Sequence, residues 1–120
     1  MVKVLVVEDT PAQMELITLY LKDNGYSVFT ANNAKDGLAL IDQENPDVVV
    51  TDVVMEGMNG FEMCRAIKKN PATEKIPVIA CTSRNTDLDR MWGMKQGIDA
   101  YLGKPFTSEE LIRTVKLVVR

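Results

Sequence analysis

Three short runs rich in valine and isoleucine place the strongest limit on the fold of this chain. They are Val2–Val7, Val48–Val50 and Val78–Cys81. An apolar run of this length is typical of a strand that is covered on both faces of a parallel sheet. The patterns at Ser27–Ala31 and Asp99–Leu102 indicate two further strands. We therefore expect a parallel sheet of about five strands.

Segments with helical periodicity lie between and after these strands. The first helix is predicted to begin at a capping box, Thr10–Gln13, with Pro11 at its first position, and to end near Asn24–Gly25. Thr107–Glu110 is a second capping box and begins the last helix. Alternating strands and helices imply right-handed crossovers, and therefore an α/β fold with a doubly wound parallel sheet. The other predicted helices are Ala34–Gln43, Gly60–Lys69 and Thr86–Gln96.

Composition limits the class of protein. A chain of 120 residues that is 46% apolar has the size and the core of one domain, residues 1–120. It carries no signal-peptide pattern and no apolar run long enough to cross a bilayer, so we expect a soluble, cytoplasmic protein without membrane contact. Its net charge is −3 and its basic residues are scattered, which argues against direct binding of nucleic acid.

The absence of histidine excludes several chemistries. A Ser-His-Asp triad and a histidine-ligated metal both require a residue that the chain lacks. The two cysteines, Cys64 and Cys81, are far apart and are expected to be free thiols in a reducing compartment. Reactivity must therefore come from carboxylates, lysine or hydroxyl groups.

Polar residues follow four of the predicted strands: Glu8–Asp9, Thr51–Asp52, Thr82–Ser83 and Lys104–Pro105. Taken singly, each has an ordinary structural explanation as a helix start, a turn, a cap or a surface lysine. Together they place three carboxylates at the sheet edge where ligands bind in such folds. Like charges gathered in this way need a cation, and oxygen-only ligands suit Mg²⁺. We infer a Mg²⁺ site beside a reactive carboxylate.

Four segments carry a family resemblance that spans essentially the whole chain. They resemble the signature segments of response-regulator receiver domains, in the same order: V-L-V-V-E-D, T-D-V-V-M-E-G-M-N-G, V-I-A-C-T-S and A-Y-L-G-K-P-F. The resemblance implies a flavodoxin-like, CheY-like (βα)5 fold. It also implies a phosphoacceptor switch of two-component signal transduction, which catalyses only its own phosphorylation and dephosphorylation.

The resemblance implies a role for each residue at the strand ends. Asp52 would accept a phosphoryl group from the phosphohistidine of a sensor histidine kinase or phosphotransfer protein. Asp9 and Asp52 would bind Mg²⁺ directly, together with the carbonyl of Val54, and Glu8 would act mainly through water. Positioning and neutralisation of charge supply nearly all the catalysis in such transfers.

The resemblance also assigns the residues that respond to the phosphoryl group. Lys104 would pair with the phosphoryl oxygens and Thr82 would hydrogen-bond to them. Tyr101 would swing inward as Thr82 moves, and the Lys104–Pro105 bond would be cis. The signal would then leave through the face formed by the fourth helix, the last strand and the last helix, and reach a downstream protein.

Some positions depart from the common receiver pattern. Glu56 stands where a proline is usual, which leaves the geometry of the loop and the Mg²⁺ affinity open. Neither Val54 nor Arg84 carries an amide or acidic group that orients the hydrolytic water, so we expect slow self-dephosphorylation. The apolar stripe of the fourth helix predicts that Trp92 belongs to the core, with a binding surface as the alternative.

The segment D-R-M-W-G-M-K-Q-G-I-D-A-Y-L-G-K-P-F is similar to stand-alone CheY-like regulators of twitching motility and phototaxis. Three alternatives fit the sequence less well than a receiver. A phosphatase of the haloacid-dehalogenase type needs a second aspartate two residues after its nucleophile, where this chain has Val54. A pseudo-receiver would have lost the reactive residues, all of which are present here. A dinucleotide-binding domain would need a G-x-G-x-x-G loop that is lacking.

Overall fold

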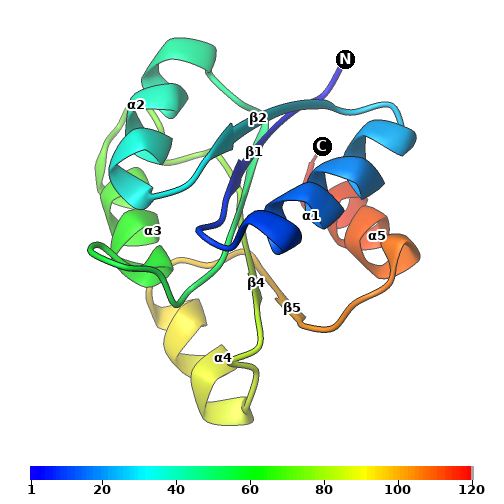
Figure 1. Ribbon diagram of the computed structural model, residues 1–120. Coiled ribbons are helices and arrows are strands. Elements are labelled where there is room, and N and C mark those ends of the chain that lie inside the picture. The colour runs from blue at the N-terminus through cyan, green and yellow to red at the C-terminus, as the bar shows by residue number, and fades with distance from the viewer. Residues whose placement is uncertain (120) are drawn as a thin grey trace.

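We describe the protein from a computed structural model, which covers residues 1–119 and contains five strands that alternate with five helices (Figure 1). The strands are β1 (Lys3–Val7), β2 (Ser27–Ala31), β3 (Val48–Thr51), β4 (Val78–Thr82) and β5 (Ala100–Gly103). The helices are α1 (Pro11–Asp23), α2 (Ala34–Glu44), α3 (Gly60–Lys69), α4 (Asp87–Lys95) and α5 (Ser108–Val118). Each predicted element is present, and its ends agree with the prediction to within two residues.

The strands form one parallel sheet in the order β2-β1-β3-β4-β5. The chain runs outward from β1 to β2 and then crosses to the other side of β1 to form β3. The strand order therefore reverses between β1 and β3, which is where ligands bind in doubly wound folds. This confirms the predicted fold class.

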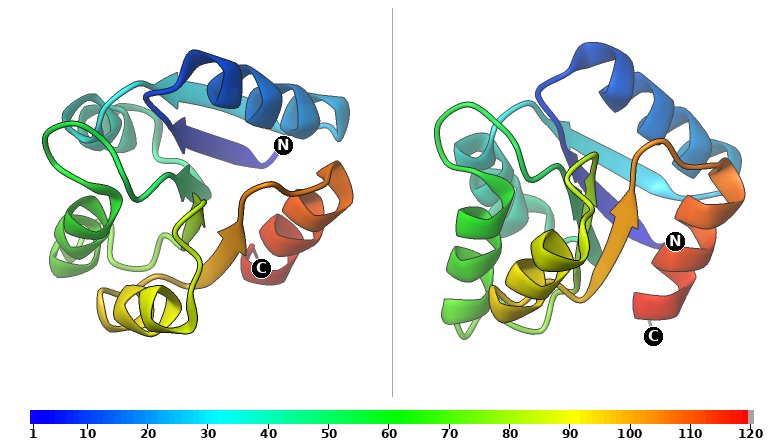
Figure 2. Two further views of the ribbon diagram at one scale, coloured as in Figure 1. Left: turned by 60° about the horizontal axis from the view of Figure 1, so that its bottom comes forward. Right: turned by 90° about the horizontal axis from the view of Figure 1, so that it is seen from below.

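Two layers of helices cover the sheet (Figures 1 and 2). In β1, alternate side chains point to opposite faces: Val4 and Val6 pack with α1 and α5, whereas Leu5 and Val7 pack with α2 and α3. All four are at most 1% exposed. Burial on both faces explains why this strand is apolar at every position after Lys3.

The local sequence predicted the start of α5 correctly, but the predicted capping of α1 is wrong. Thr107 accepts a hydrogen bond from the amide of Glu110, which confirms the predicted capping box of α5. Thr10 stands at the N-cap of α1, but its side chain makes no capping hydrogen bond, so the predicted box there is wrong. The carboxylate of Glu8 accepts the Thr10 amide instead, at 3.1 Å, because the buried Glu8 side chain reaches forward to the helix start.

Helix α4 is the least covered helix, and here a second expectation is wrong. Trp92 is 53% exposed rather than part of the core, and its neighbours Met91 and Met94 are exposed too. Only Gly93 of this helix is buried. The view from below in Figure 2 shows the reason: α4 lies at the rim of the sheet, where no other helix packs over its outer side.

The strand register places the expected site residues at one edge. Val7 is level with Thr51, so Glu8 and Asp52 leave neighbouring strands at the same height. Thr82 is likewise level with Gly103, which directly precedes Lys104. None of the helices within residues 1–119 is both long and apolar enough to cross a bilayer.

Candidate functional site

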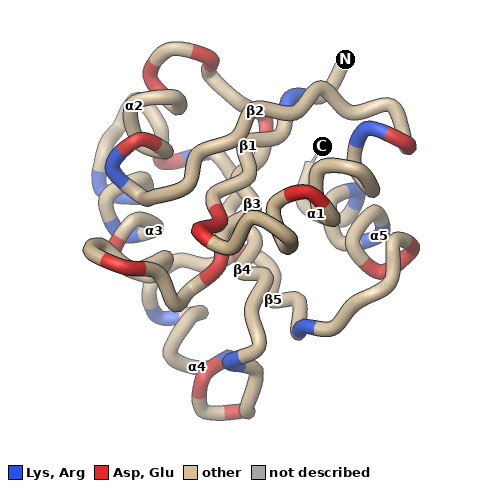
Figure 3. The backbone as a smooth tube through the Cα atoms, viewed as in Figure 1, with Lys and Arg blue, Asp and Glu red and all other residues tan. Residues whose placement is uncertain are grey.

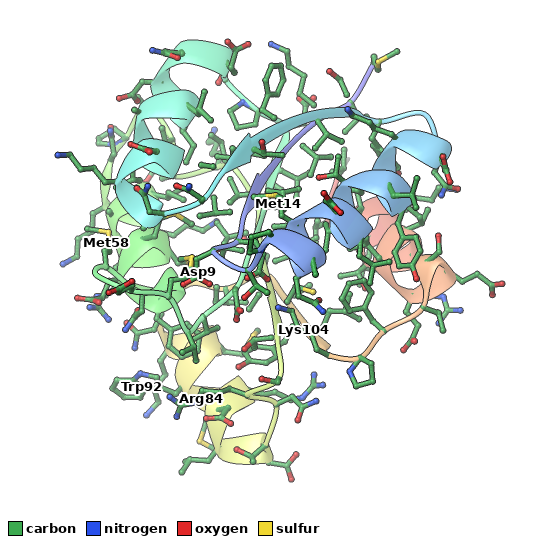
Figure 4. All side chains as sticks on the ribbon, in the orientation of Figure 1. Asp9, Met14, Met58, Arg84, Trp92 and Lys104 are labelled. Carbon is green, nitrogen blue, oxygen red and sulfur yellow. The ribbon has the colours of Figure 1, made fainter. Side chains whose placement is uncertain are left out.

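Side chains from β1, β3, β4 and β5 meet at the carboxyl edge of the sheet. Figure 3 shows acidic positions of the β1–α1 and β3–α3 loops close together, and Figure 4 shows Asp9 and Lys104 at the same edge. These loops bring together residues that are up to 96 positions apart in the chain. The polar groups at the strand ends therefore form one site, as the parallel topology requires.

Asp52 is held at both carboxylate oxygens. Its Oδ1 accepts the amide of Val53 at 2.6 Å and that of Val54 at 3.3 Å. Its Oδ2 lies 3.2 Å from Nζ of Lys104, and the Asp52 side chain is 12% exposed. Gly60 packs against the backbone of Asp52 so closely that a Cβ atom there would lie 2.1 Å from the Asp52 carbonyl oxygen. The carboxylate is therefore fixed in direction while a fraction of it stays accessible.

Lys104 pairs most closely with Glu8. Its Nζ lies 2.6 Å from Oε1 of Glu8, which is 1% exposed. Burial opposes the charged form of Lys104, but the hydrogen bond to Glu8 and the charge of Asp52 outweigh it and raise the pKa of the lysine above its ordinary value. The ammonium is therefore charged at neutral pH and bridges two carboxylates. The Lys104–Pro105 peptide bond is cis, as the resemblance implied.

Asp9 is exposed and makes a different contact. Its Oδ2 accepts the amide of Glu56 from the β3–α3 loop, at 3.4 Å. A proline at position 56 would have no amide to donate, so this contact depends on the departure from the usual receiver pattern. Gly57 follows with a φ of 77°, the left-handed conformation that glycine tolerates best.

The acidic residues fit a divalent cation by their chemistry and not by their present arrangement. Within residues 1–119, no three acidic, cysteine or histidine side chains are already arranged around one ion position. The reason is that Glu8 and Asp52 turn toward Lys104, while Asp9 turns toward Glu56. The donor set itself suits Mg²⁺, because three carboxylates against one ammonium leave two negative charges unbalanced, and all the ligands are oxygen.

Thr82 and Tyr101 are linked through the backbone of Arg84. The hydroxyl of the fully buried Thr82 accepts the Arg84 amide at 3.2 Å, and the Tyr101 hydroxyl donates to the Arg84 carbonyl. The Arg84 guanidinium lies 3.2 Å from Oδ1 of Asp89, on the first turn of α4. Burial of the ring raises the pKa of Tyr101 above its ordinary value. The loop after β4 thus joins the strand end, β5 and α4.

One cavity includes Asp52, and a second begins at the adjacent Val53. One of about 450 Å³ contains Asp52 and Lys104 in its lining and is bordered by α1 and the β5–α5 loop. The sequence analysis did not single out its other lining residues, Thr10, Gln13, Leu16, Ser83, Pro105 and Phe106, as a group. In the sequence, only their position near the ends of the strands could have identified them as lining residues. The other cavity, of about 530 Å³, lies between the β3–α3 loop and α4, with Val54, Arg84 and Trp92 in its lining.

Comparison with known proteins gives consistent results. Residues 4–116 match the family described as response regulator receiver domain. The chain is 42% identical over 119 residues to protein PilH of Pseudomonas aeruginosa, covering 99% of this chain and 98% of that protein.

Solved structures agree with this. A response regulator from Chloroflexus aurantiacus J-10-fl superposes with a TM-score of 0.94 at 29% identity, over 98% of this chain and 96% of that one. The chemotaxis response regulator CheY4 of Vibrio cholerae gives a TM-score of 0.92 at 31% identity, over 98% of both chains.

Proposed function

The chain belongs to the response regulator receiver domain family, and we propose that it is a signalling switch that carries a phosphoryl group on Asp52. The observation that carries the proposal is the placement of this carboxylate between Lys104 and the amides of Val53 and Val54, next to a cavity. These contacts orient the carboxylate toward an incoming phosphorus atom. They also leave it partly exposed, as a nucleophile must be.

The transfer proceeds by displacement at phosphorus. An oxygen of Asp52 forms a bond to the phosphorus of a phosphohistidine, and the bond from phosphorus to the imidazole nitrogen breaks. That nitrogen keeps the electron pair and takes up a proton from solvent. The ammonium of Lys104 then shifts from the carboxylates to the phosphoryl oxygens, and the hydroxyl of Thr82 hydrogen-bonds to them. Electrostatic stabilisation of this kind is the main contribution to such reactions.

Mg²⁺ is the cofactor that the proposal includes. Asp9 and Asp52 would hold it directly, with the carbonyl of Val54, and Glu8 would act mainly through water. When bound, Mg²⁺ neutralises charge on the transferring phosphoryl group. Asp9 is exposed, so it can leave the Glu56 amide to reach the ion.

The partners follow from this chemistry. A sensor histidine kinase or phosphotransfer protein supplies the phosphoryl group in the cytoplasm, and a downstream protein reads the state of the α4-β5-α5 face. Tyr101 lies on β5 and contacts the loop that leads to α4, which places it between the site and that face. The segment from Asp89 to Phe106, which is similar to stand-alone regulators of twitching motility and phototaxis, points to such a pathway as the biological setting.

The test is phosphorylation by a small donor. The protein is incubated with Mg²⁺ and acetyl phosphate, and intact mass is measured. We expect one phosphoryl group per chain, lost in Asp52→Asn and retained in the control Asp42→Asn, which removes an exposed carboxylate of α2. A pseudo-receiver would gain no mass. A phosphatase of the haloacid-dehalogenase type would instead turn over p-nitrophenyl phosphate many times.

A further inference from the structure

The side chain of Tyr101 occupies a seat that is built by residues of α3, α4 and the loop before α4. Its hydroxyl donates to the carbonyl of Arg84. The guanidinium of Arg90 lies 5.2 Å from the centre of its ring, and Nη1 of Arg90 donates to the Tyr101 carbonyl at 3.3 Å. Phe61 and Gly93 border the ring on its inner side. The ring is therefore enclosed on several sides although Tyr101 as a residue is only half-buried.

Gly93 is an unusual choice for this position when helix stability alone is considered. It lies in the interior of α4 and is the only buried residue of that helix. Glycine is less favourable than alanine in a helix interior because it loses more conformational freedom on folding. A buried helix position that carries glycine is therefore explained by what a Cβ atom would touch.

A Cβ atom at position 93 would touch two aromatic rings. It would lie 3.0 Å from Cε2 of Tyr101, and 3.2 and 3.3 Å from Cε1 and Cζ of Phe61. Separations this short require a neighbour to move by a few tenths of an ångström. Phe61 is only 8% exposed and packs in the core between the sheet, α2 and α3, whereas Tyr101 borders solvent. The Tyr101 ring is therefore the one that a Cβ atom at position 93 would displace.

We propose that Gly93 is a positioning residue of the switch: the missing side chain creates the space that lets Tyr101 take its inward seat. The inner seat and an outward placement of the ring then compete, and the residue at position 93 determines how the two are populated. Arg90 supports the seated ring from the solvent side through its cation–π contact.

The link to signalling rests on the proposed function. If Thr82 closes on a phosphoryl group while Tyr101 is seated, a variant that disfavours the seat also disfavours closure, because both residues bond to the backbone of Arg84. Coupling between two such events is reciprocal. Gly93→Ala should therefore weaken binding of a phosphoryl analogue, although position 93 touches neither Asp52 nor the metal ligands.

The first experiment tests the seat and does not depend on the proposed function. Melting temperatures are measured for the wild type, Gly93→Ala, Tyr101→Ala and the double variant. At an open helix position Gly→Ala raises the melting temperature by about 3 °C. We expect Gly93→Ala to lower it in the wild type and to leave it unchanged or raise it once the Tyr101 ring is absent. A rise in the wild-type background, or an equal fall in both backgrounds, overturns the proposal.

The second experiment tests the coupling. Beryllofluoride with Mg²⁺ serves as the phosphoryl analogue, and its binding is followed by the fluorescence of Trp92, the single tryptophan of the chain. We expect Gly93→Ala to weaken binding by about 5-fold or more in the wild type and to have no effect in Tyr101→Ala.

The outcomes separate the two proposals. If the wild type binds beryllofluoride and Gly93→Ala binds it equally well, the seat is not coupled to the switch and this inference is wrong. If the wild type does not bind beryllofluoride at all, the proposed function is wrong, and the melting temperatures still decide whether Gly93 forms the seat.

Discussion

The ammonium of Lys104 lies 2.6 Å from the carboxylate of Glu8, closer than its 3.2 Å distance to Asp52. The Glu8 side chain is 1% exposed, so it has exchanged nearly all its water for this one cation and the Thr10 amide. A buried carboxylate without a cationic partner is costly. Lys104 therefore stabilises the unphosphorylated protein as well as serving the proposed reaction.

Replacing Lys104 with methionine keeps the bulk of the side chain and removes its charge. We expect the free energy of unfolding at neutral pH to fall by about 3 kcal/mol, because Glu8 would remain buried without a partner. Urea denaturation measures the change. Lys3→Met is the control, since Lys3 pairs with Glu44 at 4.0 Å on the surface and such pairs contribute about 1 kcal/mol or less. Equal losses in the two variants would show that Glu8 does not depend on Lys104.

Mg²⁺ binding should depend on Asp9 but not on Lys104. Asp9→Asn removes a direct ligand, so we expect it to require a much higher Mg²⁺ concentration for labelling by acetyl phosphate. Lys104→Met keeps every oxygen ligand and loses a competing cation, so it should bind Mg²⁺ at least as well as the wild type but respond poorly to phosphorylation. Calorimetric Mg²⁺ titration and mass spectrometry measure the two properties. Unchanged labelling of Asp9→Asn at ordinary Mg²⁺ concentration would refute the ligand assignment.

The lifetime of the phosphoryl group should be long. Val54 is 55% exposed and carries no hydrogen-bonding side chain, and the Arg84 guanidinium is turned toward Asp89. Neither residue orients a water molecule for attack on phosphorus. We expect Val54→Asn to shorten the half-life several-fold, because an amide can hydrogen-bond to that water. Val54→Leu is the control of similar size. A wild-type half-life of seconds would contradict the prediction.

The two thiols should be inert in the folded protein. Burial raises the pKa of Cys64 from 9.0 to about 11, and burial raises that of Cys81 to about 12. At pH 8 we expect a thiol reagent to label both residues only after denaturation, because reactivity requires the thiolate and access. Fast labelling of the folded protein would contradict this burial.

The same shift predicts how stability depends on pH. A group whose pKa is higher in the folded state binds its proton more tightly there, so its contribution is complete below pH 9 and is lost as pH rises toward the folded value. The free energy of unfolding should therefore decline between about pH 9 and about pH 11. The free energy of unfolding is measured by urea titration at several pH values. Cys64→Ala should make its decline with pH less steep, whereas an unchanged slope would show that other groups cause the decline.

Tyr101→Ala should leave the rate of phosphorylation unchanged but abolish the effect of phosphorylation on partner binding. The Tyr101 hydroxyl bonds to the backbone of Arg84 and not to Asp52, so labelling by acetyl phosphate should proceed at the wild-type rate. A partner protein is first captured with the beryllofluoride-loaded wild type. Tyr101→Ala should bind this partner equally well with and without beryllofluoride, since only a difference in affinity between two states transmits a signal. Normal analogue-dependent binding would show that the signal leaves by another face.

Much of the fold and of the candidate site follows from local sequence. Within the run Val2–Val7, every position from Val4 onward is apolar, which indicates a strand covered on both faces, and β1 has that environment. Helix α3 occupies Gly60–Lys69, the predicted range. Because parallel strands end at one edge of a sheet, polar residues after four strands must gather there whatever the details of packing. That rule brings Glu8, Asp52 and Lys104 together.

Other features depend on contacts between distant segments. Apolar spacing in α4 shows which residues share a side of the helix, but not whether another element covers that side. No element covers Trp92, which is therefore exposed at the rim of the sheet. The capping pattern at Thr10 was overridden by Glu8, whose buried carboxylate takes the amide. An N-cap contributes about 1 kcal/mol, which the packing of the whole domain can override.

The sequence alone determined the fold class, the family and the chemical character of the site, because these depend on residue type and on the order of strands and helices. Only the tertiary structure decided which partner each charge takes: Lys104 prefers Glu8 to Asp52, and Asp9 contacts the Glu56 amide. It also decided that Gly93 faces Tyr101. The charge contacts join residues far apart in the chain, and all of these distances are set by how the strands and helices pack together.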